Sequence, residues 1–273
     1  METARGAKKS AIYDRLKARG AYFKDVSGWE GADWFAQEGQ EAKIEKHSWG
    51  RADWFANWEK EHKAARENVI LMDMSFMSKF MVQGRDAGKV LDYISANEVN
   101  NKLNQVTYTP WLNKNGKLEA DLTVAKLEEE KFLVVVTDTM HHHAETWLKR
   151  NIPADSHAFV SDMTSAYAQI NIQGSKSRKL MQKITLTDMS NEAFPYRHIE
   201  ELSIGYARAF CGRMTYLGEL GYELFIPTEQ ALHVYDTIIE AGKEVDLTHA
   251  GLKALGSLRM EKGYRDYGHD MDN

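Results

Sequence analysis

The carboxylate of Asp121 lies on the return strand of a β-hairpin that the sequence predicts over 108–124. Asn115-Gly116 favours a two-residue turn, because both residues tolerate the positive φ that a type I′ turn requires. Beyond the turn, apolar and polar residues alternate, so Asp121 and Thr123 face away from the layer that the apolar residues bury. Whether Asp121 faces water or a cleft therefore decides what this hairpin does.

A second carboxylate, Glu223, follows a similar alternation within 207–227. The segments Asp-Leu-Thr-Val from Asp121 and Glu-Leu-Phe-Ile from Glu223 are expected to occupy equivalent places in two halves of the protein. Carboxylates suit two tasks here: they accept an N–H pair of a heterocycle through two oxygens, and they stabilise a developing cation. A single carboxylate on a strand is usually solvent-facing, so it is the duplication that favours a site.

Two further segments offer ligand-binding chemistry, and each has a simpler explanation. Tyr216 begins YLGELGY, whose glycines permit close backbone approach and whose rings can stack on a ligand. A plain glycine-containing turn explains this stretch equally well. Arg259 lies near the end of the last predicted helix, where a cation interacts favourably with the helix dipole even without a ligand.

The remaining reactive side chains predict no metal or redox site. Three consecutive histidines at 141–143 diverge by about 100° each on a helix and do not converge on one ion. We therefore expect a solvated helix start there. Cys211 is the one cysteine, which excludes an internal disulfide and fits a buried, inert thiol in a reducing compartment. No Gly-x-Gly-x-x-Gly or Walker motif predicts a nucleotide site.

The elements that position these residues form an internal repeat with an offset of ninety residues. A strand, a glycine turn and an amphipathic helix at 80–94 are matched at 170–184, with Asp86 and Ser175 as the expected helix caps. Further strands follow each copy, and helices at 141–150 and 229–241 close the two halves. The matched positions are Phe80, Val82, Gln83, Gly84, Val90, Leu91 and Ile94 with Ile170, Ile172, Gln173, Gly174, Leu180, Met181 and Ile184.

This order predicts an α+β fold of two pseudo-symmetric halves with mainly antiparallel sheets flanked by helices. A ligand cleft is expected between the halves. We place a Trp-rich N-terminal segment at 1–60, packed irregularly on the body through two Asp-Trp-Phe copies, the first half at 61–165 and the second at 166–273. A helix is predicted over 59–72.

Composition bounds the possible functions. The 273 residues are 43% hydrophobic and 27% charged, as in an ordinary globular protein. The net charge of −5 gives no reason to expect nucleic acid as a partner. No apolar run approaches the roughly twenty residues of a membrane span, and the N-terminus has no secretory h-region. We therefore expect a cytoplasmic protein with neither a nucleic-acid nor a membrane partner.

Four motifs, taken together, resemble the aminomethyltransferase (glycine cleavage T-protein) family in order and spacing. The N-terminal run YDRLKARGAYF…GWEGADWFA is similar to one branch, the tetrahydrofolate-binding part of dimethylglycine and sarcosine dehydrogenases. The resemblance spans nearly the whole chain. The motifs are Tyr108-Thr-x-x-Leu-Asn113, Gly116…Asp121-Leu-Thr-Val, Tyr216-x-Gly-Glu-x-Gly-Tyr-Glu223, and Ser257-Leu-Arg259-Met-Glu-Lys-Gly263 followed by Gly268-His-Asp270.

The resemblance implies tetrahydrofolate-dependent transfer of an aminomethyl or methyl group, with roles that follow the matching positions. Asp121 matches the catalytic carboxylate near the reactive nitrogens of the folate, and Glu223 matches the acid that grips the pterin ring. Tyr216 matches an aromatic residue that packs on the folate, and Arg259 matches a folate-contacting arginine. Tyr108 matches a tyrosine of the pocket wall, and Thr123, on the same face as Asp121, is placed with the cofactor-binding residues.

The resemblance also limits what this chain is expected to do alone. Family members continue into a C-terminal β-barrel domain, and the dehydrogenases have a preceding flavin domain; this sequence contains neither. We therefore expect a small one-carbon donor, supplied by a flavin dehydrogenase or by a lipoyl carrier protein. The alternatives are a non-catalytic folate-binding module and a truncated, inactive member. The iron–sulfur assembly relatives carry Lys-Gly-Cys-Tyr where this chain has Lys262-Gly263-Tyr264, which argues against that branch.

Overall fold

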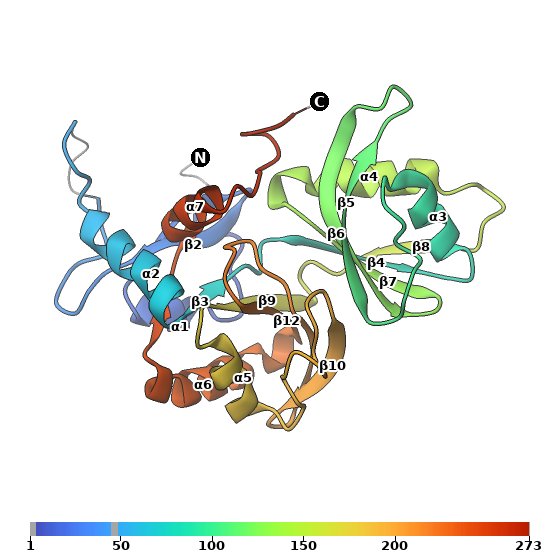
Figure 1. Ribbon diagram of the computed structural model, residues 1–273. Coiled ribbons are helices and arrows are strands. Elements are labelled where there is room, and N and C mark those ends of the chain that lie inside the picture. Colours follow the sequence, from blue (N-terminus) through green and yellow to red (C-terminus); the bar gives the residue numbers. More distant parts are fainter. Residues whose placement is uncertain (1–3, 45–48, 273) are drawn as a thin grey trace.

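The computed structural model describes residues 4–44 and 49–272, which form two helix-covered sheets and a small N-terminal hairpin (Figure 1). Among these residues no helix is both long and apolar enough to cross a membrane. The strands are β1 (Ala21–Val26), β2 (Trp29–Phe35), β3 (Val69–Asp73), β4 (Ser78–Gln83), β5 (Gln105–Leu112), β6 (Leu118–Glu128), β7 (Lys131–Val136), β8 (Phe159–Asp162), β9 (Tyr167–Gln173), β10 (Ile199–Ile204), β11 (Ala207–Gly212), β12 (Gly221–Pro227) and β13 (Leu247–His249). The α-helices are α1 (Tyr13–Ala18), α2 (Phe55–Glu67), α3 (Ala87–Ile94), α4 (His141–Asn151), α5 (Ser177–Ile184), α6 (Ala231–Gly242) and α7 (Leu252–Glu261), and short 3-10 turns precede α4 at Asp138–Met140, precede α6 at Thr228–Gln230 and follow α6 at Lys243–Val245.

The two large sheets share one topology. The five-stranded sheet runs β5-β6-β7-β4-β8, and the six-stranded sheet runs β10-β11-β12-β9-β3 with β13 added at its edge. Every pairing in both is antiparallel except that of β13 with β3. The offset of ninety residues relates β4 to β9, α3 to α5 and α4 to α6. The predicted α+β fold with two pseudo-symmetric halves is therefore confirmed.

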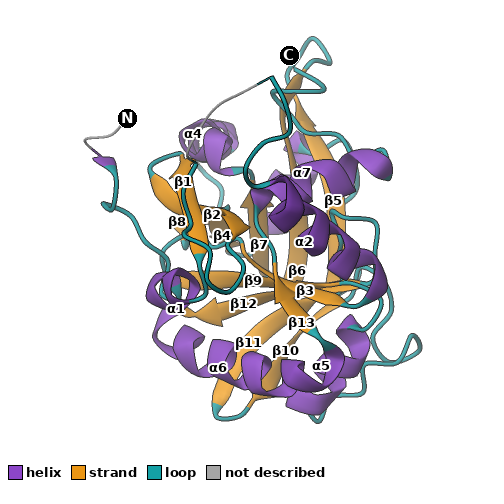
Figure 2. Cartoon of the chain, turned by 90° about the vertical axis from the view of Figure 1, so that its left-hand side faces the viewer, coloured by secondary structure: helices purple, strands orange, loops and turns teal. Residues whose placement is uncertain are grey.

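Each sheet buries one face under helices and turns the other face toward the second sheet. Apolar side chains of α3 and α4 cover the outer face of the five-stranded sheet, and those of α1, α5 and α6 cover the outer face of the six-stranded sheet. A layer of apolar side chains fills the space between the two sheets. Figure 2 shows the strands lying between the flanking helices. Members of this inner layer include Met81, Ala125, Leu127, Leu133 and Val135 from one sheet and Ile199 and Phe225 from the other.

The N-terminal hairpin and the helices α2 and α7 form a further layer beside the six-stranded sheet. The buried carboxylate of Glu61 on α2 accepts hydrogen bonds from the backbone N–H of Phe35 at 2.7 Å and of Gly251 at 2.9 Å. It thereby joins the end of β2 to the start of α7. Burial raises the pKa of Glu61 to about 8, against the opposing effect of these two hydrogen bonds.

Several local predictions fail at element boundaries. The predicted helix over 59–72 ends at Glu67, and Val69 and Met72 lie in β3, because their apolar run is buried within the sheet. The N-terminal segment is not irregular over residues 21–35, which pair as β1 and β2. The expected caps Asp86 and Ser175 bond elsewhere: Asp86 accepts from the N–H of His157, and Ser175 donates to the carbonyl of Asn68.

The hairpin of residues 105–128 forms as predicted, with a different turn. Leu112 pairs with Leu118, so the loop holds five residues instead of two. The N–H of Gly116 donates to the carbonyl of Asn113, and Gly116 alone within this loop has a positive φ, of 75°. This geometry is a turn followed by a left-handed glycine, in place of a type I′ turn.

Asp121 and Glu223 do not occupy equivalent positions in the two halves. Phe80 of β4 pairs with Val134 of β7, and Ile170 of β9 pairs with Leu224 of β12, so Glu223 corresponds to Leu133. Asp121 instead lies on β6, whose counterpart is β11. The expected equivalence was wrong because the alternation of apolar residues is the same on neighbouring strands and does not identify the strand.

Candidate functional site

Asp121 faces the inner layer between the two sheets. Its neighbours at two-residue spacing, Thr123 and Ala125, share this face, and Ala125 belongs to the inner apolar layer. Tyr108 pairs with Thr123 across β5 and β6 and donates a hydrogen bond from its hydroxyl to Asp121 Oδ2 at 3.0 Å. Three of the predicted site residues therefore lie together at one end of the layer.

Burial determines the electrostatics of this end. It raises the pKa of Asp121 above its ordinary value, and the hydrogen bond from Tyr108 partly opposes that rise. Burial and the nearby charge of Asp121 raise the pKa of Tyr108, which therefore keeps its proton and remains a hydrogen-bond donor. The pair is a carboxylate held in place by a neutral phenol.

Tyr216 and Arg259 lie near this pair, at the segment that follows α7. The Tyr216 hydroxyl donates to the carbonyl of Arg265 at 2.7 Å, and burial together with Asp266 raises the pKa of Tyr216 to about 12. Arg259 is buried, donates to the carbonyl of Tyr264 at 3.1 Å and forms an ion pair with Asp270. Its guanidinium thus binds the chain's own segment in this structure.

Glu223 lies deeper between the sheets than Asp121. Asn171, its partner across β9 and β12, donates to Glu223 Oε1 at 3.4 Å. Gln169, the next inward residue on β9, donates to the side chain of Asn171 at the same distance of 3.4 Å. Burial raises the pKa of Glu223 to about 7, and the single amide donor only partly opposes this rise.

Polar atoms without partners surround this carboxylate. Among the described residues, the buried Oε1 atoms of Gln169 and Gln173 on the same face of β9 have no hydrogen-bond partner within the protein. Buried polar groups are normally paired, so a ligand with several N–H and carbonyl groups fits this lining. The inner face of the six-stranded sheet therefore offers unpaired acceptor oxygens beside Glu223.

Two tyrosines that the sequence reasoning did not select link the deep and the outer residues. Tyr264 lies 5.8 Å from Tyr216 between ring centroids, and burial, with smaller contributions from Tyr264 and Glu223, raises the pKa of Tyr196. Tyr264 directly follows Gly263, the last residue of the motif that contains Arg259, which was a usable signal. Tyr196 lies in an unpatterned loop, which gave none.

The histidine run separates in the structure. His143 Nε2 lies 2.9 Å from Glu119 Oε2, whereas His141 Nε2 lies 3.2 Å from Asp162 Oδ2. The three histidines therefore do not converge, as expected for consecutive helical residues. His141 and His142 nevertheless gather with Glu145, one turn further along α4, an arrangement that the sequence reasoning did not consider.

Comparison with known proteins identifies the family. Residues 12–273 match the GCVT N-terminal domain. The chain belongs to this family. It is 38% identical over 271 residues to 4-methylaminobutanoate oxidase (formaldehyde-forming) of Paenarthrobacter nicotinovorans, a match that covers 99% of this chain and 33% of that protein. It is 33% identical over 213 residues to an aminomethyltransferase of Halothermothrix orenii, covering 78% of this chain and 58% of that protein.

The fold of the family is shown by a solved structure. The glycine cleavage system aminomethyltransferase T of Bartonella henselae superposes with a TM-score of 0.79 at 21% identity, over 97% of this chain and 65% of that chain. The chain therefore has the fold of this domain. It spans about a third of the oxidase and somewhat more than half of the aminomethyltransferase, which are the curated relatives described above.

Proposed function

We propose that this chain binds tetrahydrofolate between its two sheets and transfers a one-carbon unit, aminomethyl or methyl, from a small amine-type donor. The observation that supports this most directly is the pair of inward-facing carboxylates with raised pKa values, one deep and one at the open end. Tyrosines accompany the outer carboxylate: Tyr108 donates to Asp121, and Tyr216 lies against Tyr264. Membership of the GCVT N-terminal domain family points to the same reaction.

Glu223 is proposed to hold the pterin ring. Its carboxylate offers two acceptor oxygens to neighbouring ring N–H groups, and the unpartnered oxygens of Gln169 and Gln173 add acceptors on the same face. With its pKa raised to about 7, Glu223 is partly protonated in the free protein at neutral pH. Binding an N–H pair favours the ionised form, so ligand binding is expected to release a fraction of a proton.

Asp121 is proposed as the catalytic residue. Tetrahydrofolate would supply the nucleophilic nitrogen that accepts the one-carbon unit. Asp121 would position that nitrogen and stabilise positive charge as the carbon moves, and Tyr108 holds its carboxylate at 3.0 Å. Tyr216 and Thr123 are proposed to line the folate site. Contact between Arg259 and the folate stays a prediction, because its guanidinium is paired with Asp270.

The donor is proposed to reach Asp121 in an activated form. The oxidase that matches the chain is named as formaldehyde-forming, which supports an iminium delivered by an amine-oxidising partner. A lipoyl-bound aminomethyl group is the second candidate, supported by the match to an aminomethyltransferase. Supplying tetrahydrofolate with each donor class, and measuring the one-carbon folate product, distinguishes the two.

Binding and catalysis are tested separately. Tetrahydrofolate is titrated while intrinsic Trp fluorescence is followed, and saturable binding is expected. Asp121→Asn should keep the affinity within a few-fold yet abolish transfer, whereas Glu223→Ala should chiefly weaken binding. No saturable binding would refute the proposal. Binding without transfer in the wild type, with every donor class, would leave a non-catalytic folate-binding module.

A further inference from the structure

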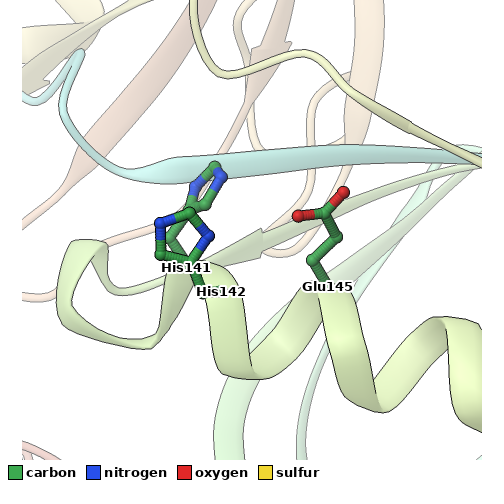
Figure 3. A group of neighbouring side chains, drawn as sticks. All are labelled: His141, His142 and Glu145. Atoms are coloured by element: carbon green, nitrogen blue, oxygen red, sulfur yellow. The ribbon is translucent and has the colours of Figure 1, made fainter.

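The start of α4 gathers three potential metal ligands. His141, His142 and Glu145 each offer one ligand atom, and these atoms lie within 4.8 Å of one another (Figure 3). Residues four apart on a helix lie on the same face, so Glu145 returns to His141 after one turn, and His142 lies beside both. The third ligand is thus a carboxylate one turn along the helix instead of the third histidine.

His141 is already oriented as metal-binding histidines usually are. Its Nδ1 atom lies 2.9 Å from the hydroxyl oxygen of Ser78, a buried residue of β4. In the tautomer that carries its proton on Nδ1, this contact is an N–H donation to Ser78, and Nε2 keeps a free electron pair. Ligating histidines almost always donate their other ring N–H in this way, which fixes the ring and its tautomer.

Asp162 supplies a second carboxylate at the same place. Its Oδ2 atom lies 3.2 Å from His141 Nε2, and it ends β8, the edge strand of the five-stranded sheet. Lys149 Nζ donates to Glu145 Oε1 at 2.6 Å, so the second carboxylate oxygen of Glu145 remains available for a cation. The two imidazoles and the Glu145 carboxylate would give three protein ligands, and a zinc site of this kind leaves its fourth position to water.

The cluster is accessible to solvent. His141, His142 and Asp162 line a cavity of about 440 Å³ that is also lined by Trp29 of β2 and other residues of the N-terminal segment. An ion can therefore enter without opening the fold. The cavity is also lined by Lys8 and Lys9, whose positive charges disfavour a cation held by charge alone.

We propose that His141, His142 and Glu145 at the start of α4 bind one divalent transition-metal ion of the zinc class. Imidazole and carboxylate ligands select Zn²⁺, Co²⁺, Ni²⁺ or Cu²⁺ over Mg²⁺ and Ca²⁺, which prefer sites built from oxygen alone. The site lies apart from Asp121 and Glu223, so it is independent of the folate proposal.

Calorimetric titration of the full chain with Zn²⁺, with Mg²⁺ as the hard-ion comparison, tests this proposal. One Zn²⁺ per chain is expected, with a rise in Tm because the ion binds the folded state. His142→Ala and Glu145→Gln should each weaken Zn²⁺ binding at least about tenfold, and Ser78→Ala about tenfold through loss of the His141 orientation.

His143→Ala is the matched control, because His143 belongs to the same run and points toward Glu119. It should leave Zn²⁺ affinity and the Tm rise unchanged. His142 and His143 are both exposed, so neither variant threatens the fold. Zn²⁺ binding no tighter than that of Mg²⁺, or an equal loss in His142→Ala and His143→Ala, would overturn the proposal.

Discussion

The half built on the five-stranded sheet and the half built on the six-stranded sheet turn from strand to helix in the same way. Gly84 and Gly174 have φ values of 124° and 128°. In each half the backbone N–H two residues later, at Asp86 and at Lys176, donates to the carbonyl that precedes the neighbouring strand. A Cβ on Gly84 would lie 2.2 Å from one such carbonyl oxygen, that of His157, which explains why glycine stands there.

The two halves also contain matching turns. Asp73-Met-Ser75 ends β3 and Asp162-Met-Thr164 ends β8, and in both the aspartate accepts the backbone N–H two residues on. The hydroxyl of each turn then accepts from the backbone N–H of the neighbouring strand in the same sheet, at Gln169 of β9 and at Lys79 of β4. This Asp-Met-Ser/Thr pair was visible in the sequence and was not used in the sequence reasoning.

The equivalent residues Lys79 and Gln169 show how the halves differ. Lys79 is buried, donates to the carbonyls of Ser75 and Met77, and has its pKa lowered to about 7 by burial. Gln169 in the same position is neutral and belongs to the polar face beneath Glu223. The repeat thus supplies the scaffold, and the chemistry lies at positions where the two halves no longer match.

Replacing either turn glycine by alanine tests the similarity of the two halves and should have the largest effect on stability. Gly84→Ala and Gly174→Ala are each expected to lower the free energy of unfolding by about 3 kcal/mol or more, because φ is positive and the new Cβ meets a backbone oxygen at 2.2 and 2.5 Å. Denaturant unfolding measures this. Gly256→Ala, in α7 with open space around it, should be neutral or slightly stabilising. If either alanine variant were as stable as the wild type, the Gly84 and Gly174 turns would not be structurally equivalent.

Replacing Glu223 by its counterpart tests where the chemistry lies. Glu223→Leu, which copies Leu133, should weaken tetrahydrofolate binding at least about tenfold while stabilising the fold. Because burial raises the pKa of Glu223 to about 7, the wild type loses stability as pH rises from about 4.5 through 7. The advantage of the variant should therefore be greater at pH 8 than at pH 5.

Unfolding measurements at the two pH values, paired with the folate titration, provide this test. Glu201→Leu on the exposed face of β10 is the control, and it should change neither affinity nor the pH dependence. If Glu223→Leu bound tetrahydrofolate as tightly as the wild type does, the pterin ring would not contact Glu223.

Glu61 lies in the layer formed by the N-terminal hairpin, α2 and α7, which in the described part of the chain has no counterpart beside the five-stranded sheet. A substitution of Glu61 therefore tests this layer. Glu61→Gln keeps one acceptor oxygen and places an NH₂ group against a backbone N–H, so it should lower the free energy of unfolding by about 1–3 kcal/mol. The pKa of Glu61 is raised to about 8, so its ionisation destabilises the fold as pH rises from about 4.5 to 8. The variant should therefore lose less stability than the wild type across that range, and a parallel pH profile would contradict the assignment.

Tyr108→Phe should have the smallest effect. Loss of the hydroxyl removes a donor that holds down the pKa of Asp121, so that pKa should rise further and the acidic limb of the pH–rate profile should move to higher pH. Stability should change by about 1 kcal/mol or less. Tyr93→Phe, 81% exposed on α3, is the control that should leave the profile in place. An unchanged profile in Tyr108→Phe would separate Tyr108 from Asp121 in catalysis.

The sequence by itself determined the local pattern. The ninety-residue repeat, the alternation that sends Asp121 and Thr123 to one face, and the helices that begin near His141 and Ala231 all follow from periodicity and turn residues. These features depend on neighbours within a few positions, and such preferences are readable along a single segment.

Only the tertiary structure decided which segments meet. The apolar run at Val69 is equally suited to a helix and to a buried strand, and its pairing with β9 selects the strand. The register of β12 against β9 assigns Leu133, and not Asp121, as the counterpart of Glu223. Arg259 forms an ion pair with Asp270 because the chain turns back after α7, and no periodicity in the sequence predicts that turn. Strand order and such contacts join residues far apart in the sequence, and short-range preferences do not specify them.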